Sequence, residues 1–194
     1  AAMIALGMGA SVTVLDRSPD AMQALWKQFG APLKTEFSTH DTVERHVARA
    51  DLVIGGVLVP GASAPKLVTA EMVRKMQPGS VIVDVAIDQG GCCETSHATT
   101  HADPTYVVDG VIHYCVANMP GGVARTSTFA LNNATLPYGL TLADKGWQRA
   151  LADDPHLRDG LNVAFGNVTC KPVAEALGHA YVDPLTVLAA SHGR

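Results

Sequence analysis

The feature that most constrains the fold is an alternation of short apolar segments with amphipathic ones, which continues as far as Cys115. The apolar segments are rich in β-branched residues, as in Ser11–Leu15, Asp51–Val57 and Ser80–Ala86, and predict buried strands. Helical patterns with N-cap residues at Ser18 and Thr69 lie between them. We therefore expect an α/β chain with a doubly wound, Rossmann-like parallel sheet covered by helices. Alternation alone does not distinguish this fold from other doubly wound folds.

The two ends of the chain differ from this pattern. The first residues read as the end of a helix closed by Gly7 and Gly9, so we expect a sheet that is incomplete at its N-terminus. After residue 124 the alternation stops, and Arg125–Leu142 predicts one long helix followed by shorter ones. We expect residues 1–124 to form the α/β domain and residues 125–194 to be a helical return segment of a second domain.

Composition excludes several classes of protein. The chain has 14 Lys and Arg against 18 Asp and Glu, a net charge of −4, which is not the basic footprint of a nucleic-acid-binding protein. The apolar run Leu52–Val59 is far shorter than the ~20 residues of a membrane span. The cysteines are Cys92, Cys93, Cys115 and Cys170, and a chain of this length needs no disulfide staples. We expect a cytoplasmic protein with free thiols.

Two acidic residues stand where a ligand could bind. Asp16 ends the first strand directly before a capped helix, where dinucleotide-binding folds hold the adenosine ribose; the alternative is an ordinary turn acid, and Arg17 beside it could hold a 2′-phosphate. Asp88 follows the strand Ser80–Ala86 and precedes two glycines, which places it at the ligand-binding edge of a parallel sheet. Its alternative is a turn aspartate bonded to local amides. Asp84, inside the strand, is expected to be structural.

Other segments have both a functional and a structural interpretation. The loop at Leu58 and Val59 could line a flat ligand or be a plain surface turn. The amide of Asn118 could bind a carboxamide or carbonyl, although an Asn before Pro-Gly-Gly is also typical of a turn. The spacing Glu94–His97–His101 could suggest a metal, but adjacent cysteines rarely bind one ion together, and we expect no metal site. The sequence has no Gly-x-Ser-x-Gly turn of a hydrolase.

Taken together, these segments resemble bacterial alanine dehydrogenase. The resemblance is carried by Gly7–Asp16, Ala50–Ala62, Ala64–Val68, Pro78–Gly91, Tyr114–Pro120 and Thr126–Thr128. Its most specific parts are Ala86–Gly91 and Cys115–Pro120. The α-subunit of nicotinamide nucleotide transhydrogenase is similar, but it usually carries Ala-Glu-Asn-Gly-Gly where this chain has Ile87–Gly91.

The resemblance implies reversible oxidative deamination of L-alanine to pyruvate and ammonia with NAD, in a hexamer without nucleic-acid or membrane partners. It implies that residues 1–124 are the NAD-binding domain and residues 125–194 belong to the substrate domain. The implied catalytic residue is Asp88. The implied cofactor-binding residues are Asp16, Ser38, Leu58, Val59, Ile87, Asp88, Val116, Asn118 and Met119.

The resemblance also shows what this sequence does not contain. The family's Gly-rich turn, catalytic histidine and substrate-binding lysine and arginine have no counterpart here, and Cys93 and His97 depart from the family pattern. We therefore expect the chain alone to be inactive. Two alternatives stay open: a transhydrogenase-like NAD(H)-binding module, for which Asp88 is unfavourable, and a non-catalytic nucleotide-binding remnant.

Overall fold

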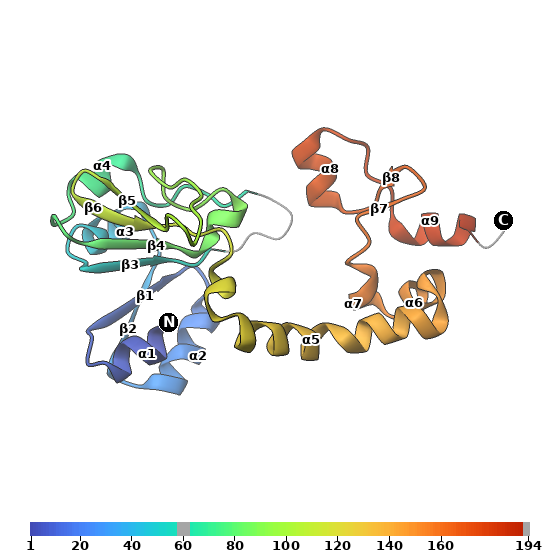
Figure 1. Ribbon diagram of the computed structural model, residues 1–194, viewed down its shortest axis with the longest axis horizontal. Helices are drawn as coiled ribbons and strands as arrows, with labels where there is room; N and C mark the ends of the chain where they lie inside the picture. The colour runs from blue at the N-terminus through green and yellow to red at the C-terminus, as the bar shows by residue number, and fades with distance from the viewer. Residues whose placement is uncertain (58–62, 192–194) are drawn as a thin grey trace. The chain divides into compact units, whose positions relative to one another are not determined.

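The computed structural model describes residues 1–57 and 63–191 (Figure 1). The chain divides into two compact units. The first consists of residues 1–56 and 65–116, and the second contains the residues from 117 onward. None of the helices formed by the described residues is long and apolar enough to cross a membrane.

The first unit is an alternation of helices and strands. Its helical segments are α1 (Ala2–Gly7), α2 (Pro19–Phe29), α3 (His40–Val47), α4 (Ala70–Arg74) and the 3₁₀ turn η1 (Val85–Gln89). Its strands are β1 (Val12–Asp16), β2 (Leu33–Phe37), β3 (Leu52–Gly55), β4 (Val81–Asp84), β5 (Thr105–Val108) and β6 (Val111–Tyr114). The predicted caps are confirmed, since Ser18 Oγ accepts from Ala21 N (3.2 Å) and Thr69 Oγ1 from Met72 N (3.2 Å).

The strands of the first unit form two sheets. β1 pairs in parallel with β2, and the other sheet has the order β3-β4-β6-β5. Strands β3, β4 and β6 are parallel, which confirms the predicted parallel sheet. In Rossmann terms β2-β1 and β3-β4-β6 correspond to strands 3-2 and 4-5-6. In the Rossmann order 3-2-1-4-5-6, strand 1 lies between strands 2 and 4. Among the described strands, none pairs with the edge of β1 that faces away from β2 or with the edge of β3 that faces away from β4.

One strand departs from the predicted parallel pattern. β5 runs antiparallel to β6, and the two are joined at Asp109 and Gly110, whose φ angles are 51° and 80°. Positive φ at both central residues is the geometry of a type I′ turn, for which Asp-Gly is a favoured pair. The sheet is therefore mixed at this edge.

The core of the first unit lies between α3, α4 and the larger sheet. Its buried members include Val43 and Val47 of α3, Met72 and Val73 of α4, and Ile82 of β4. Burying an aliphatic side chain of this size contributes about 1.5–3 kcal/mol. The buried side chains of α3 and α4 therefore cover the larger sheet.

The second unit is mainly helical. Its elements are η2 (Met119–Val123), α5 (Ala124–Lys145), α6 (Trp147–Asp153), α7 (Pro155–Arg158), β7 (Val163–Ala164), β8 (Asn167–Val168), α8 (Lys171–Leu177) and α9 (Pro184–Ser191). The predicted long helix is present as α5, the long yellow helix of Figure 1, and it ends at Gly146 with a φ of 74°. No residue of α5 is buried. The β7–β8 hairpin and α9 were not predicted.

Candidate functional site

The two residues expected near an adenosine lie side by side. Asp16 ends β1, and Ser38 follows β2 and donates its backbone N–H to Asp16 O (2.9 Å). The carboxylate of Asp16 accepts from Ser18 N through Oδ1 (2.8 Å), while Oδ2 makes no hydrogen bond among the described residues. A carboxylate oxygen and a half-buried serine are thus presented together at the carboxyl ends of two parallel strands, where ligands bind in such sheets.

Asp88 lies on a turn and not on the tip of a strand. The predicted strand Ser80–Ala86 is too long, because β4 ends at Asp84 and the next five residues form η1. Within η1, Ile87 is buried and Asp88 is exposed. Gly90 ends the turn in the left-handed conformation, with a φ of 88°, which favours glycine. The turn therefore presents the Asp88 carboxylate to solvent beyond the carboxyl end of β4.

The buried carboxylate of this region is Asp84, which is fully inaccessible to solvent. Its Oδ2 accepts from Cys92 N (2.9 Å), Cys93 N (3.1 Å) and Ser96 Oγ (2.7 Å). A buried charge satisfied by several donors is a structural element, which confirms the expectation for Asp84. It ties the loop after η1 to the end of β4.

Two glycines let this loop approach Asp84 closely. A Cβ atom on Gly91 would lie 2.8 Å from Asp84 Oδ2, and a Cβ on Gly55 would lie 2.3 Å from Cys92 Sγ.

Burial and the neighbouring Asp84 carboxylate raise the pKa of Cys92 to about 12. The Cys92 thiol therefore stays protonated near neutral pH, which argues against a nucleophilic role.

Sequence reasoning missed the part played by Lys66. Its ammonium donates to Gly90 O (2.5 Å), Gly91 O (2.9 Å) and Cys93 O (3.2 Å). The sequence signal was a single charged residue in the otherwise uncharged stretch from 57 to 68. Its partners lie 24 to 27 residues further along the chain, so spacing alone could not identify them.

A second buried network lies behind the loop. His113 is fully buried, and its Nδ1 lies 3.0 Å from Val111 O and its Nε2 2.7 Å from Thr95 Oγ1. Nδ1 must donate to the carbonyl, so Nε2 accepts from the threonine hydroxyl. Burial lowers the pKa of His113, and the imidazole is neutral. Tyr106 stacks against both His113 and His97, with ring centroids 5.0 Å and 3.7 Å away.

The remaining predicted site residues are a buried valine, two residues at a local turn and two residues outside the described part of the chain. Val116 is 2% exposed, so its side chain belongs to the core and only its backbone could meet a ligand. Asn118 is exposed and Met119 half-buried, and Asn118 Oδ1 accepts from Gly121 N (3.2 Å), which is the cap of a local turn. Both belong to the second unit. Leu58 and Val59 lie outside the described residues.

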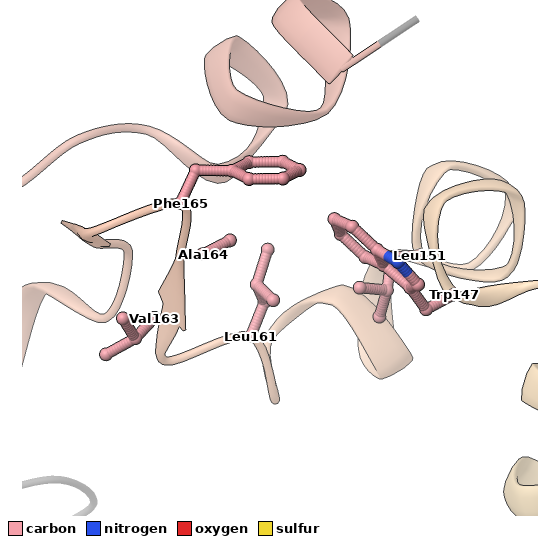
Figure 2. Close-up of a pocket in the computed structure, with 6 residues that line it drawn as sticks. All are labelled: Trp147, Leu151, Leu161, Val163, Ala164 and Phe165. Atoms are coloured by element: carbon pink, nitrogen blue, oxygen red, sulfur yellow. The ribbon is translucent and has the colours of Figure 1, made fainter. Parts of the chain in front are cut away.

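Other features of the described residues lie apart from these positions. An apolar hollow of about 300 Å³ in the second unit is shown in Figure 2 and is lined by Trp147, Leu151, Leu161, Val163, Ala164 and Phe165. It contains none of the predicted site residues. Within residues 1–57 and 63–191, no three His, Cys, Asp or Glu side chains are grouped so that they could hold a metal ion.

Comparison with known proteins relates this geometry to a family. The chain is 62% identical over 188 residues to the alanine dehydrogenase of Halomonas elongata, covering 97% of this chain and 51% of that protein. A solved structure of L-alanine dehydrogenase matches with a TM-score of 0.80 at 48% identity, covering 91% of this chain and 49% of that one. A transhydrogenase structure from Sinorhizobium meliloti matches less well, with a TM-score of 0.53 at 33% identity over 62% of this chain and 33% of that one.

These matches have two consequences. The chain spans about half the length of the curated relatives it matches, and its first unit has the Rossmann-type fold of the solved alanine dehydrogenase. The family model described as "Alanine dehydrogenase/PNT, C-terminal domain" matches residues 1–171. The chain therefore belongs to the family of the alanine dehydrogenase/PNT C-terminal domain.

Proposed function

We propose that this chain is the part of an NAD-dependent alanine dehydrogenase that contains the NAD-binding domain, residues 1–124, and a segment of the substrate domain, residues 125–194. The enzyme converts L-alanine reversibly to pyruvate and ammonia. The observation that carries the proposal is the exposed Asp88 on η1, held beyond the carboxyl end of β4 in the segment Ala86–Gly91. That segment is one of the two most specific parts of the resemblance, and relatives that are 55–62% identical to this chain are alanine dehydrogenases.

The residues at the sheet edge fit a dinucleotide. Asp16 Oδ2 is available to accept hydrogen bonds from the ribose hydroxyls, and Ser38 lies directly beside it. At the other strand ends, η1 would border the nicotinamide through the exposed Asp88 and through the backbone of the buried Ile87. We assign Val116 through its backbone, together with Asn118 and Met119, to the same end of the cofactor. The proposed role of Leu58 and Val59 rests on the resemblance alone, because both lie outside the described residues.

The chemistry fits a carboxylate such as Asp88. NAD, when bound, accepts the hydride that leaves the alanine Cα. Positive charge then develops on the amino-acid nitrogen and carbon, and water must add before ammonia leaves. An aspartate at this place stabilises the developing cation and can hold or release a proton for the water. Its exposure in this chain leaves the carboxylate open to a substrate brought by another part of the protein.

The transhydrogenase alternative has weaker support. The solved transhydrogenase aligns with less of this chain, at lower identity and with a lower TM-score, than the solved alanine dehydrogenase does. The residue at position 88 also differs from the transhydrogenase pattern. We therefore favour hydride exchange with an amino acid over hydride transfer to a protein partner.

We also propose a homo-oligomer in a reducing, cytoplasmic compartment. Helix α5 exposes large apolar side chains, of which Phe129, Leu131 and Leu140 are more than half exposed. An exposed apolar surface of this kind is typical of a protein interface.

The cysteines Cys92, Cys93, Cys115 and Cys170 are all free thiols, as expected in a reducing compartment.

The test compares the 194-residue chain with the full-length protein that contains it. The full-length protein should bind NADH and form it from NAD and L-alanine, whereas the isolated chain should show no turnover. Binding is measured by NADH fluorescence and turnover by absorbance. A full-length protein that binds NADH but leaves L-alanine unchanged would contradict the proposed reaction. Turnover by the isolated chain would contradict the proposed division of the active site.

A further inference from the structure

The loop that follows Asp88 has every backbone polar group from Gly90 to Cys93 satisfied. The N–H groups of Gly90 and Gly91 donate to Ile87 O (3.0 Å) and Ala86 O (2.9 Å), within η1. The N–H groups of Cys92 and Cys93 donate to the Asp84 carboxylate. The loop is therefore attached on its donor side both to the turn that carries Asp88 and to the buried end of β4.

Lys66 satisfies most of the acceptor side of the same loop. Its Nζ lies 2.5, 2.9 and 3.2 Å from the carbonyl oxygens of Gly90, Gly91 and Cys93. The remaining carbonyl, Cys92 O, accepts from Leu67 N (2.8 Å) and Val68 N (3.1 Å), the residues next to Lys66. An ammonium has three N–H donors, and each has one carbonyl here. Lys66 thus binds the carbonyl groups of the loop and Asp84 binds its N–H groups.

The conformation of this loop is one that the backbone would not keep without help. Gly90 and Gly91 both have positive φ, 88° and 76°, and glycine loses more conformational freedom on ordering than any other residue. Removing the ammonium would leave the carbonyls of Gly90 and Gly91 to water, whereas Cys93 O would keep its bond from Ser96 N (3.2 Å). Gly90 and Gly91 would then be held only through their N–H groups, which bond them directly to η1, and any shift of the two glycines would pass to that turn.

We propose that Lys66 is a positioning residue for Asp88, which it fixes through the carbonyl groups of Gly90, Gly91 and Cys93. The inference rests on the proposed function, because it assigns to Lys66 the placement of the carboxylate that acts there. Lys66 itself touches neither substrate nor cofactor in this account. A displacement of about 1 Å in a catalytic group can lower a rate by about 100-fold. Loss of the three hydrogen bonds from Lys66 should therefore lower turnover measurably.

The experiment uses the full-length protein with Lys66→Met, Asp88→Asn and the double variant. We expect Lys66→Met to lower kcat by about 10- to 100-fold with little change in the KM for NAD. In the Asp88→Asn background the same change should lower the residual rate less than about twofold, because residues that act as a unit are not additive. Amide hydrogen exchange at Gly90 and Gly91 should be about tenfold faster in Lys66→Met.

Matched variants separate positioning from general damage. Lys75→Met removes a lysine that bonds Glu44 (2.6 Å) and Glu71 (2.8 Å) in the same unit, and should leave kcat unchanged. If Lys66→Met does not fold, Lys66→Gln keeps two of the three donors and should lose less activity.

The outcomes distinguish the two proposals. Suppose that Lys66→Met, or Lys66→Gln in its place, has the wild-type kcat while Asp88→Asn has lost most of its activity. That result would overturn the positioning role of Lys66 and leave the proposed function standing. A further tenfold loss in the double variant would also overturn it, because Lys66 would then act independently of Asp88. Full activity in Asp88→Asn would instead overturn the catalytic assignment on which the inference rests.

Discussion

The buried carboxylate of Asp84 should be the most sensitive single side chain of the first unit. In Asp84→Ala, the amides of Cys92 and Cys93 and the hydroxyl of Ser96 lose their acceptor. An unmet buried donor costs about 1–3 kcal/mol. Partial hydration of the space would reduce the sum over the three donors, so we expect about 3–5 kcal/mol of lost stability.

The conservative variant Asp84→Asn should lose less. The asparagine oxygen can still accept from the two amides, while its NH₂ group turns toward Cys92 Sγ, which lies 3.4 Å from Asp84 Oδ1. What is lost is the charge of the acceptor, which roughly doubles the strength of such bonds. We expect about 1–2 kcal/mol of lost stability for this variant.

The assay is urea unfolding, followed by far-UV circular dichroism and by fluorescence of Trp26 in a Trp147→Phe background. Trp26 lies in α2, in the same unit as Asp84. With a urea dependence of about 2 kcal/mol per molar, Asp84→Ala should lower the midpoint by about 2 M. Asp51→Ala, which removes an exposed aspartate, is the control. Equal midpoints for Asp84→Ala and Asp51→Ala would refute the reasoning.

Three further predictions follow from the same region and from the adenosine end. Gly91→Ala should lower the free energy of unfolding, measured in urea, more than Gly90→Ala does. Both glycines have positive φ, but only a Cβ on Gly91 would meet Asp84 Oδ2, at 2.8 Å. The difference should be about 1–3 kcal/mol, and equal losses of stability would contradict this reasoning. Because burial lowers the pKa of His113, its contribution to stability is complete above about pH 6.5, where the unfolded histidine is also neutral, and is lost as the pH falls below that value. The urea midpoint should therefore fall between about pH 7.5 and 5.5 more steeply in the wild type than in His113→Gln, and parallel pH profiles would refute this. Asp16→Ala in the full-length protein should weaken NAD binding relative to NADP, and an unchanged ratio of the two dissociation constants would show that Arg17 or another group decides the selectivity.

The elements of this fold could be predicted where their causes are local. The caps at Ser18 and Thr69 are visible in the sequence because a hydroxyl three residues before a backbone N–H is a local signal. The adjacency of Asp16 and Ser38 follows from the parallel register of two strands, which the alternation implies. The antiparallel β5 was missed although Asp109-Gly110 is a hairpin signal, because the alternation was extended to the end of the sheet.

The parts that could not be predicted depend on long-range contacts. The hydrogen bonds from Lys66 join its own segment to the loop that starts at Gly90, and no periodic pattern in the sequence relates these two segments. The end of β4 at Asp84, four residues before Asp88, is fixed by donors from Cys92, Cys93 and Ser96, which become neighbours only after the loop folds back. A strand pattern in the sequence continues through Ala86, since Val85 and Ala86 are apolar, and so it predicts a longer strand than the structure has.

The measurement that tests the central claim most directly is steady-state turnover of L-alanine and NAD by the full-length Asp88→Asn variant, together with NADH binding by fluorescence. We expect kcat to fall by about 10²- to 10⁴-fold, with the dissociation constant of NADH within about threefold of the wild-type value. Wild-type turnover in this variant would show that the carboxylate on η1 has no part in the reaction.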